Sequence, residues 1–159
     1  MKNYEIVTSH GIDTVEGRPC KFAELPNMKF FIHKVNNRYY SLSEVSTGLE
    51  VFNDITIKGV KNKLLEFLKT HDKSILYSCV NSSKTVEQYR EYINKKDKLL
   101  NEFKSTFGFE APICPLTNSL DVIALDRLLH TPDGISTSNF IKNKYGKTAC
   151  RIVQDFISI

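Results

Sequence analysis

The feature that most constrains the fold is a long amphipathic stripe between Thr85 and Gly108. Thr85 and Gln88 have the spacing of a capping box, in which the two side chains satisfy free backbone N–H groups at the start of a helix. Gly108 suits the other end, because a helix often closes on a residue with positive φ. One apolar face runs between these ends at alternating spacings of three and four, made of Val86, Tyr89, Ile93, Leu100, Phe103 and Phe107, with Lys96 in its middle. We therefore predict a single helix over residues 85–107.

The predicted helix allows two kinds of packing. Its apolar face can lie across a β-sheet, or it can form a seam between two copies of the chain, since the spacing also matches a heptad. We expect it to carry the largest interface of the molecule, with a monomer favoured over a homodimer. Arg90, Lys95 and Lys98 would then line the exposed side and meet an acidic partner. These three are the predicted partner-binding residues.

The segment before this helix has the pattern of an antiparallel sheet. Aromatic and β-branched residues predict a strand over 28–35, and Asn36-Asn37 suits a two-residue hairpin turn before a returning strand over 38–45. Thr47-Gly48 is then either a corner leading to a third strand or a loop that approaches a ligand. Further predicted elements are strands at 4–9 and 20–24 with a loop between them, a helix at 57–71, and a strand at 74–80.

The last third of the chain is predicted to be helical. Pro112 and Pro115 mark the best candidate boundary, so we expect an α+β unit over 1–111 and a helical subdomain over 112–159. Three short helices are expected, over 118–130, from Ser136 to Tyr145-Gly146, and from about 149 to 157, the first with Leu120, Ile123, Ala124 and Leu128 as its apolar stripe. The predicted fold is thus α+β: an antiparallel sheet of three to five strands, covered by the helices at 57–71 and 85–107, followed by a helical third.

Composition limits the classes of function. The net charge of +4 permits contact with nucleic acid without arguing for it. No apolar run approaches the roughly 18 residues that cross a bilayer, and the first residues lack the apolar core of a signal peptide. We expect a cytoplasmic protein that does not enter a membrane.

Residues that could carry chemistry are scattered. The four cysteines and four histidines lack the short spacings of a metal site, so no metal and no cofactor are expected. His130 and Asp133 could orient a general base or simply form a surface turn, and Cys114 has no nearby base or helix start to lower its thiol pKa. Glu44 and Glu50 could form a carboxylate pair or lie on the surface of adjacent strands. A non-enzymatic protein is expected, with a hydrolase using His130 or Cys114 as a third possibility.

The C-terminal segment offers a nucleic-acid site. Its order of helix, glycine turn and helix is that of a helix-turn-helix, which would place basic side chains toward a phosphate backbone. The predicted nucleic-acid-binding residues are Lys142, Lys144, Lys147 and Arg151. The alternative is that these are solvated side chains on a packing helix.

Two stretches carry a resemblance. KFFIHKVNNRYYSLSEVSTGLEVFNDITIKGVKNKLLEFL (residues 29–68) and STSNFIKNKYGKTACRIVQDFI (136–157), with Thr47-Gly48 and Tyr145-Gly146 as shared marks, resemble segments of small uncharacterised accessory proteins of phages, prophages and conjugative elements of low-GC Gram-positive bacteria. The resemblance implies a setting: accessory genes acting on host nucleic-acid machinery, including inhibitors of host defence nucleases (anti-CRISPR-like). It implies no catalytic residue.

These observations together predict a non-enzymatic macromolecule-binding accessory protein of a mobile genetic element. Its expected partner is a protein or protein–nucleic-acid complex of the host, and direct contact with nucleic acid is possible. The alternative is a DNA-binding regulator that uses the C-terminal helices.

Overall fold

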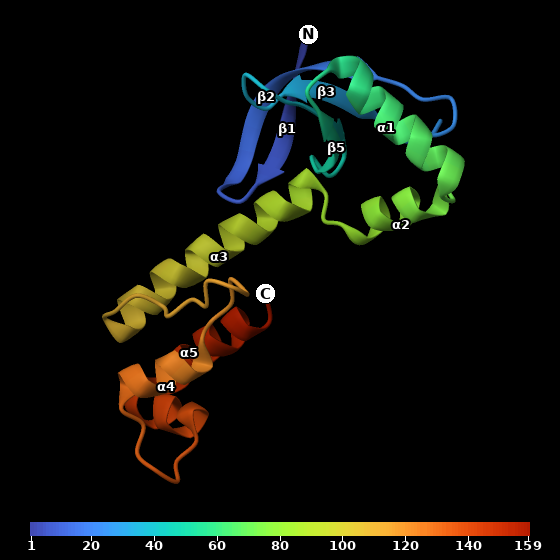
Figure 1. The fold of residues 1–159 in the computed structure, drawn as a ribbon. Coiled ribbons are helices and arrows are strands. Elements are labelled where there is room, and N and C mark those ends of the chain that lie inside the picture. Colours follow the sequence, from blue (N-terminus) through green and yellow to red (C-terminus); the bar gives the residue numbers. More distant parts are fainter. The chain divides into compact units, whose positions relative to one another are not determined.

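The computed structural model describes residues 1–159, whose contacts form two compact units, Met1–Glu91 and Tyr92–Ile159 (Figure 1). The fold is α+β, with a five-stranded antiparallel sheet followed by helices, as predicted. Along the chain the elements are β1 (Lys2–Thr8), β2 (Gly11–Cys20), β3 (Phe30–Lys34), β4 (Tyr40–Glu44), β5 (Glu50–Asp54), α1 (Ile57–Thr70), α2 (Ser74–Ser82), α3 (Val86–Phe107), α4 (Val122–Leu129) and α5 (Thr137–Ile157).

The sheet is a meander in which each strand pairs with the next along the chain. Residues 11–20 form the strand β2, although the glycines and Pro19 of this segment predict mostly loop. Pro19 has no backbone N–H to donate. It is tolerated here because the pairing of β2 with β1 ends at Gly17, which pairs with Lys2, so β1 requires no hydrogen bond from residue 19. One further hydrogen bond, from Val7 N to Gly48 O at 3.3 Å, joins β1 to the β4–β5 turn.

The loop between β3 and β4 is longer than the predicted two-residue turn. The ladder ends at the pair Lys34–Tyr40, and Asn36 organises the residues between. Its Oδ1 accepts hydrogen bonds from Arg38 N at 2.7 Å and Tyr39 N at 3.1 Å. An Asn side chain can thus replace the tight backbone turn that Asn-Asn suggested.

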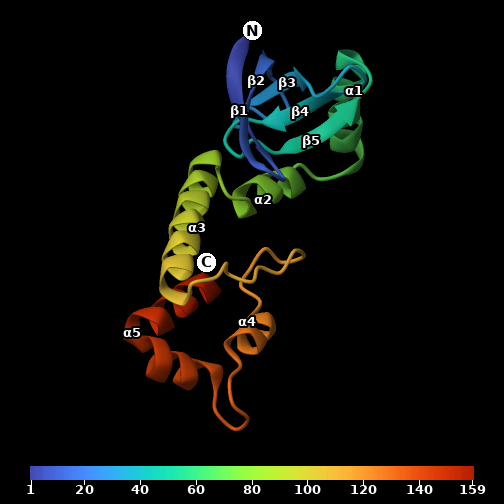
Figure 2. The same ribbon diagram turned by 90° about the vertical axis from the view of Figure 1, so that its left-hand side faces the viewer.

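One face of the sheet forms the first hydrophobic core with α1. Alternate residues of β3 and β4 point to this face, and α1 contributes Val60 and Leu64, both fully buried. Figure 2 shows α1 beside β4 and β5, the two strands that it contacts most. Thr56 caps the helix, its hydroxyl accepting a hydrogen bond from Gly59 N at 2.9 Å.

Residues 74–80 form part of α2, so the predicted strand is wrong. A short apolar run fits a buried strand and a helix equally well, and in this segment the residue before its N-terminal end favours the helix. The Asp72 carboxylate accepts a hydrogen bond from Ser74 N at 2.7 Å and starts the helix. Leu76 is then buried in the first core, with Tyr77 and Val80 packed against it.

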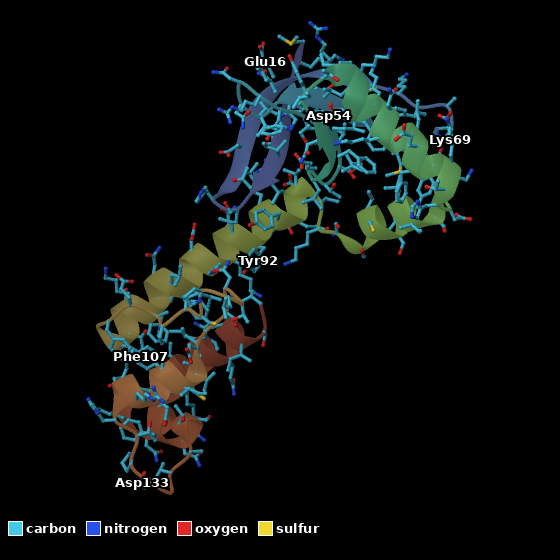
Figure 3. All side chains as sticks on the ribbon, viewed as in Figure 1. Glu16, Asp54, Lys69, Tyr92, Phe107 and Asp133 are labelled. Atoms are coloured by element: carbon cyan, nitrogen blue, oxygen red, sulfur yellow. The ribbon has the colours of Figure 1, made fainter.

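The long helix α3 spans the predicted residues, but three of its four buried side chains, all but Val86, belong to a second core. Leu99, Phe103 and Phe107 pack with residues of α4 and α5, whereas the prediction had them cover the sheet. Figure 3 marks Phe107 near the C-terminal end of α3; its ring lies 4.3 Å from that of Phe103 and 4.9 Å from that of Tyr145, between ring centroids. This aromatic cluster gives the apolar stripe its partners within the helical unit.

The C-terminal helices differ in extent from those predicted. α4 begins only at Val122, because residues 113–120 form a small hairpin closed by the pair Ile113–Leu120. The helix break predicted at Tyr145-Gly146 is confirmed: α5 is interrupted at Gly146, with φ 89° and ψ 178°. No helix of the chain is both long enough and apolar enough to cross a membrane.

Candidate functional site

The Thr47-Gly48 stretch is a turn built around a buried carboxylate. Gly48 has φ +66°, and Glu44 is only 4% exposed. The Glu44 carboxylate accepts hydrogen bonds from Ser46 N (3.0 Å), Ser46 Oγ (2.7 Å), Thr47 N (2.9 Å) and Thr47 Oγ1 (3.0 Å). Glu50 is exposed and accepts a hydrogen bond from Asn53. Glu44 is therefore neither a surface residue nor half of a carboxylate pair, but the support of the turn.

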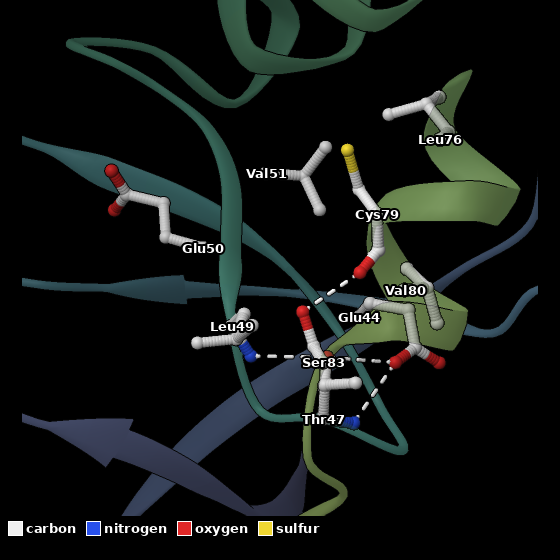
Figure 4. A pocket seen from close by; sticks show the side chains of 9 residues that line it. All are labelled: Glu44, Thr47, Leu49, Glu50, Val51, Leu76, Cys79, Val80 and Ser83. Carbon is white, nitrogen blue, oxygen red and sulfur yellow. Dashed lines mark hydrogen bonds between the residues drawn. The ribbon is translucent and has the colours of Figure 1, made fainter.

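A pocket of about 220 Å³ lies between this turn and α2 (Figure 4). Its walls are mainly aliphatic, and Cys79 contributes an exposed thiol. The hydroxyls beside it are already bonded, Thr47 to Glu44 and Ser83 to the Cys79 carbonyl at 2.7 Å. The pocket thus has an apolar lining, and both hydroxyls beside it are already hydrogen-bonded within the protein.

His33 is a buried polar residue that sequence reasoning did not single out. It is 5% exposed, its Nε2 lies 3.3 Å from Ser43 Oγ, and Ser43 Oγ lies 3.3 Å from Ser41 Oγ. Its Nδ1 has no hydrogen-bond partner. Burial lowers the pKa of His33 from its usual value of 6.5, because the interior disfavours the charged imidazolium. Both serines of this cluster are at most 1% exposed.

The three predicted partner-binding residues on α3 have different surroundings. Arg90 forms ion pairs with Glu5 and Glu87, which compensate its charge. Lys98 is 77% exposed along its side chain and lies 3.9 Å from Glu102. Lys95 is exposed and forms no ion pair. Of the three residues, only Lys95 thus has no carboxylate within ion-pair distance.

Lys96 has a structural role that explains its place in the apolar stripe. Its Nζ donates hydrogen bonds to the carbonyl oxygen of Asn118, at 3.0 Å, and to the Asn118 side chain. Asn118 has φ +55°, at the tip of the hairpin over 113–120. Partial burial lowers the pKa of Lys96. The Lys96 ammonium therefore binds this hairpin to α3 and is not available to an external partner.

The predicted nucleic-acid-binding residues are likewise divided. Arg151 is held by two carboxylates, Asp155 at 2.6 Å and Glu102 at 2.9 Å. The Lys144 ammonium lies 5.2 Å and 5.3 Å from the ring centroids of Phe140 and Tyr145. Lys142 and Lys147 are exposed and form no ion pair. Three lysines are thus available around the break at Gly146, while Arg151 is engaged.

The two residues weighed as catalytic candidates lack the partners that catalysis needs. His130 closes α4 with φ +52°, and no hydrogen bond joins it to Asp133 in the following loop (Figure 3). The expectation for Cys114 is wrong in one respect: hydrogen bonds from the Thr117 side chain, then from the backbone N–H groups of Thr117 and Leu116, hold the thiol pKa below its ordinary value. None of the described hydrogen bonds joins that sulfur to a histidine, the partner that a nucleophilic Cys–His pair would use.

A groove between α4 and α5 was missed from the sequence. It has a volume of about 260 Å³ and is lined by Val122, Leu125, Thr137, Ser138, Ile141, Cys150, Val153, Gln154 and Ile157. Val122 is 42% exposed and Ile157 61% exposed at its rim, whereas Leu125 and Ile141 are buried at its base. The groove is therefore an apolar surface open to solvent.

The helix α4 itself is mostly apolar. Six of its eight residues, VIALDRLL, are apolar, a composition typical of a helix enclosed in a core. Leu125 and Leu129 are buried, but Ile123 is 68% exposed and Leu128 51% exposed. Of the predicted stripe, Leu120 is buried, but Ile123 and Leu128 are exposed, because the helix turns Leu125 and Leu129 inward. The large number of apolar residues in so short a helix was the signal that could have revealed exposed apolar side chains.

No three or more His, Cys, Asp or Glu side chains come together in an arrangement that could hold a metal ion. Comparisons with protein-family models, with curated proteins and with solved structures found no match.

Proposed function

We propose that the protein is a non-enzymatic macromolecule-binding accessory protein of a mobile genetic element. Its helical unit would occupy the surface of a host protein or protein–nucleic-acid complex. The observation that supports this function is α4, a mostly apolar helix that leaves Val122, Ile123 and Leu128 open to solvent. Several large apolar side chains exposed on one short helix favour an interaction site over an ordinary solvated surface.

Three charged residues that could have served a functional site have structural roles instead, which supports binding over chemistry. Glu44 supports a turn, Lys96 holds a hairpin, and Arg151 joins two carboxylates. The mobile-element setting, and the more specific idea of an anti-CRISPR-like inhibitor of a host defence nuclease, come from the resemblance of residues 29–68 and 136–157. In that setting the protein would act in the host cytoplasm.

The proposed function is tested by affinity capture from a bacterial lysate. The variant Ile123→Glu/Leu128→Glu places charges on the exposed sides of α4 and should lose the captured partner. Both side chains are more than half exposed, so the fold should persist, which circular dichroism checks. The matched control is Ile55→Glu/Ile75→Glu, two exposed isoleucines of the sheet unit, which should retain capture. Equal capture by both variants would remove α4 from the binding surface.

A DNA-binding regulator is the second candidate. It is favoured by Lys142, Lys144 and Lys147, which lie around the break at Gly146 without ion pairs to carboxylates. Against it, Arg151 is already bound to Glu102 and Asp155.

Filter binding to duplex DNA over a range of salt concentrations separates the two candidates. The proposed function predicts no more than weak, non-specific DNA binding at near-physiological salt. Three phosphate contacts would give a slope of about −3 in log K against log salt. Tight binding with such a slope, lost in Lys142→Glu/Lys144→Glu/Lys147→Glu, would establish the regulator instead.

A further inference from the structure

We infer that the groove between α4 and α5 receives the apolar face of an acidic amphipathic helix from a partner protein. This inference rests on the proposed function and specifies the chemistry of its partner. Three observations carry it: the size of the groove, the distribution of apolar and polar residues along it, and the uncompensated charge at its rim.

The size of the groove suits inserted side chains better than a whole small molecule. Its volume of about 260 Å³ lies below the roughly 300–1,000 Å³ typical of small-molecule sites. Leu125, Ile141 and Val153 form an apolar base, and Val122 and Ile157 stand exposed at the rim. A helix laid into such a groove can insert residues spaced by three or four along one face.

The rim of the groove carries positive charge from α5. Lys142 follows the lining residue Ser138 by four positions, and Lys147 precedes Cys150 by three. Residues at these spacings are neighbours on a helix surface, so both lysines flank the groove. Both are exposed, and neither forms an ion pair. The ammonium groups are therefore available to carboxylates of a bound segment.

Three acidic residues of the helical unit, Asp121, Asp126 and Asp155, have hydrogen-bond or ion-pair partners within the chain. Asp121 accepts a hydrogen bond from Ala124 N at 2.9 Å, and Asp126 accepts one from Thr137 Oγ1 at 2.6 Å. The hydrogen bond from Thr137 holds the pKa of Asp126 below its usual value. Asp155 pairs with Arg151. None of these carboxylates forms an ion pair with Lys142 or Lys147, so both ammonium groups at the rim are free to meet an acidic ligand.

An acidic helix explains the apolar walls together with the lysines. A nucleic-acid backbone would use the lysines but leave Val122 and Ile157 without contact. A neutral apolar peptide would cover those walls but leave Lys142 and Lys147 unpaired. The combination of apolar walls and basic rim is the complement of a helix with leucines on one face and glutamates beside them.

The test uses the full chain and a fluorescein-labelled peptide of about four helical turns. Leucines occupy one face of the peptide, at spacings of three and four, and glutamates flank them. Two matched peptides replace either every glutamate by lysine or every leucine by serine. Fluorescence anisotropy should show saturable binding of the first peptide and none of the other two. Binding of the first peptide should weaken with added salt.

Variants of the groove give the second half of the test. Ile157→Glu and Ser138→Phe should each weaken the acidic peptide by at least about tenfold, the first by charging the rim and the second by filling the groove. Lys142→Glu/Lys147→Glu should weaken it similarly. Ile55→Glu and Lys58→Glu, exposed positions of the sheet unit, should leave the affinity unchanged.

The outcomes separate this inference from the proposed function. No binding of the acidic peptide, or equal binding of the lysine peptide, overturns the acidic helix as the occupant. If lysate capture still depends on Ile123 and Leu128, the proposed function stands without it. Displacement of the peptide by duplex DNA, with Ile157→Glu having no effect on either ligand, overturns the inference in favour of a nucleic-acid surface.

Discussion

His33 is the residue whose environment differs most from what its type would suggest. It is enclosed in the sheet unit with an unbonded Nδ1, and its only side-chain partner is the Ser43 hydroxyl. Burial disfavours the charged imidazolium at this site, and this effect outweighs the opposing influence of the Lys34 backbone and Glu50.

The burial of His33 predicts that stability depends on pH. Because its pKa is lower in the folded chain than the usual 6.5, the unfolded chain binds more protons as the pH falls through that value. The free energy of unfolding should therefore decrease as the pH falls below 6.5, by about 1.4 kcal/mol for each unit that separates the two pKa values.

Urea denaturation between pH 8 and pH 5 measures this dependence. In His33→Gln, which does not titrate, that part of the decrease should disappear. His10→Gln, a substitution of an exposed histidine, serves as the control and should retain the full decrease in the free energy of unfolding. An unchanged pH profile in His33→Gln would assign the effect to another group.

At the scale of single residues, local patterns were predictable and burial was not. The capping box is confirmed, with Gln88 N donating to Thr85 Oγ1 at 3.2 Å and Thr85 N donating to Gln88 Oε1 at 2.9 Å. All of its atoms lie within four residues of sequence. The role of Lys96 depends instead on Asn118, 22 residues away, and no local pattern encodes that meeting.

Among the elements, the β4–β5 turn has the strictest requirement. Gly48 has φ +66°, and a Cβ there would lie 2.8 Å from the Glu5 carbonyl oxygen and 3.0 Å from Ile6 Cα. Both neighbours are backbone atoms of β1, which cannot move aside as a side chain can.

Gly48→Ala is therefore predicted to destabilise more than Gly108→Ala. Gly108 also has a positive φ, of +78°, but a Cβ added there would meet no atom within 4 Å. The Gly108 substitution should cost about 1–2 kcal/mol from backbone strain alone. Gly48→Ala should cost about 1–3 kcal/mol more from the clash. Urea unfolding of the two variants measures the difference, and equal losses would show that β1 yields without strain.

The elements that were mispredicted are those whose type depends on tertiary partners. Residues 74–80 were short and apolar enough for either a strand or a helix, and α2 formed because Asp72 starts it. In α4 six of the eight residues are apolar, so several apolar stripes were available and the pattern did not single out Leu125 and Leu129. The long α3 was predictable because its stripe and both caps agree.

The whole molecule contains two separate hydrophobic cores. Leu42 is fully buried in the core of the sheet unit, and Leu125 is fully buried in that of the helical unit. Each core is built from side chains of its own unit. The predicted boundary at 111 came from the prolines, whereas contacts divide the chain within α3.

Because the two cores are separate, a cavity made in one core should destabilise mainly the unit that contains it. Leu42→Ala and Leu125→Ala should each lower local stability by about 2–5 kcal/mol. Hydrogen exchange should accelerate mainly in residues 1–91 for the first variant and in residues 92–159 for the second. Equal acceleration across the chain in either variant would show that the units unfold as one.

The second core also bears on self-association. Phe103 and Phe107, two residues of the heptad-spaced face, are buried within the helical unit, and Lys96 is bound to Asn118. Little of that face is left for a second copy of the helix, so a monomer stays the prediction.

The Glu44 turn has a consequence for the order in which the chain folds. All four donors to its carboxylate come from Ser46 and Thr47, two and three residues away. Contacts this local close with little loss of chain entropy and form early. The bond from Val7 to Gly48 joins segments far apart in sequence and must wait for a larger loop to close. The β4–β5 hairpin is thus expected to be the nucleus on which β1 later docks.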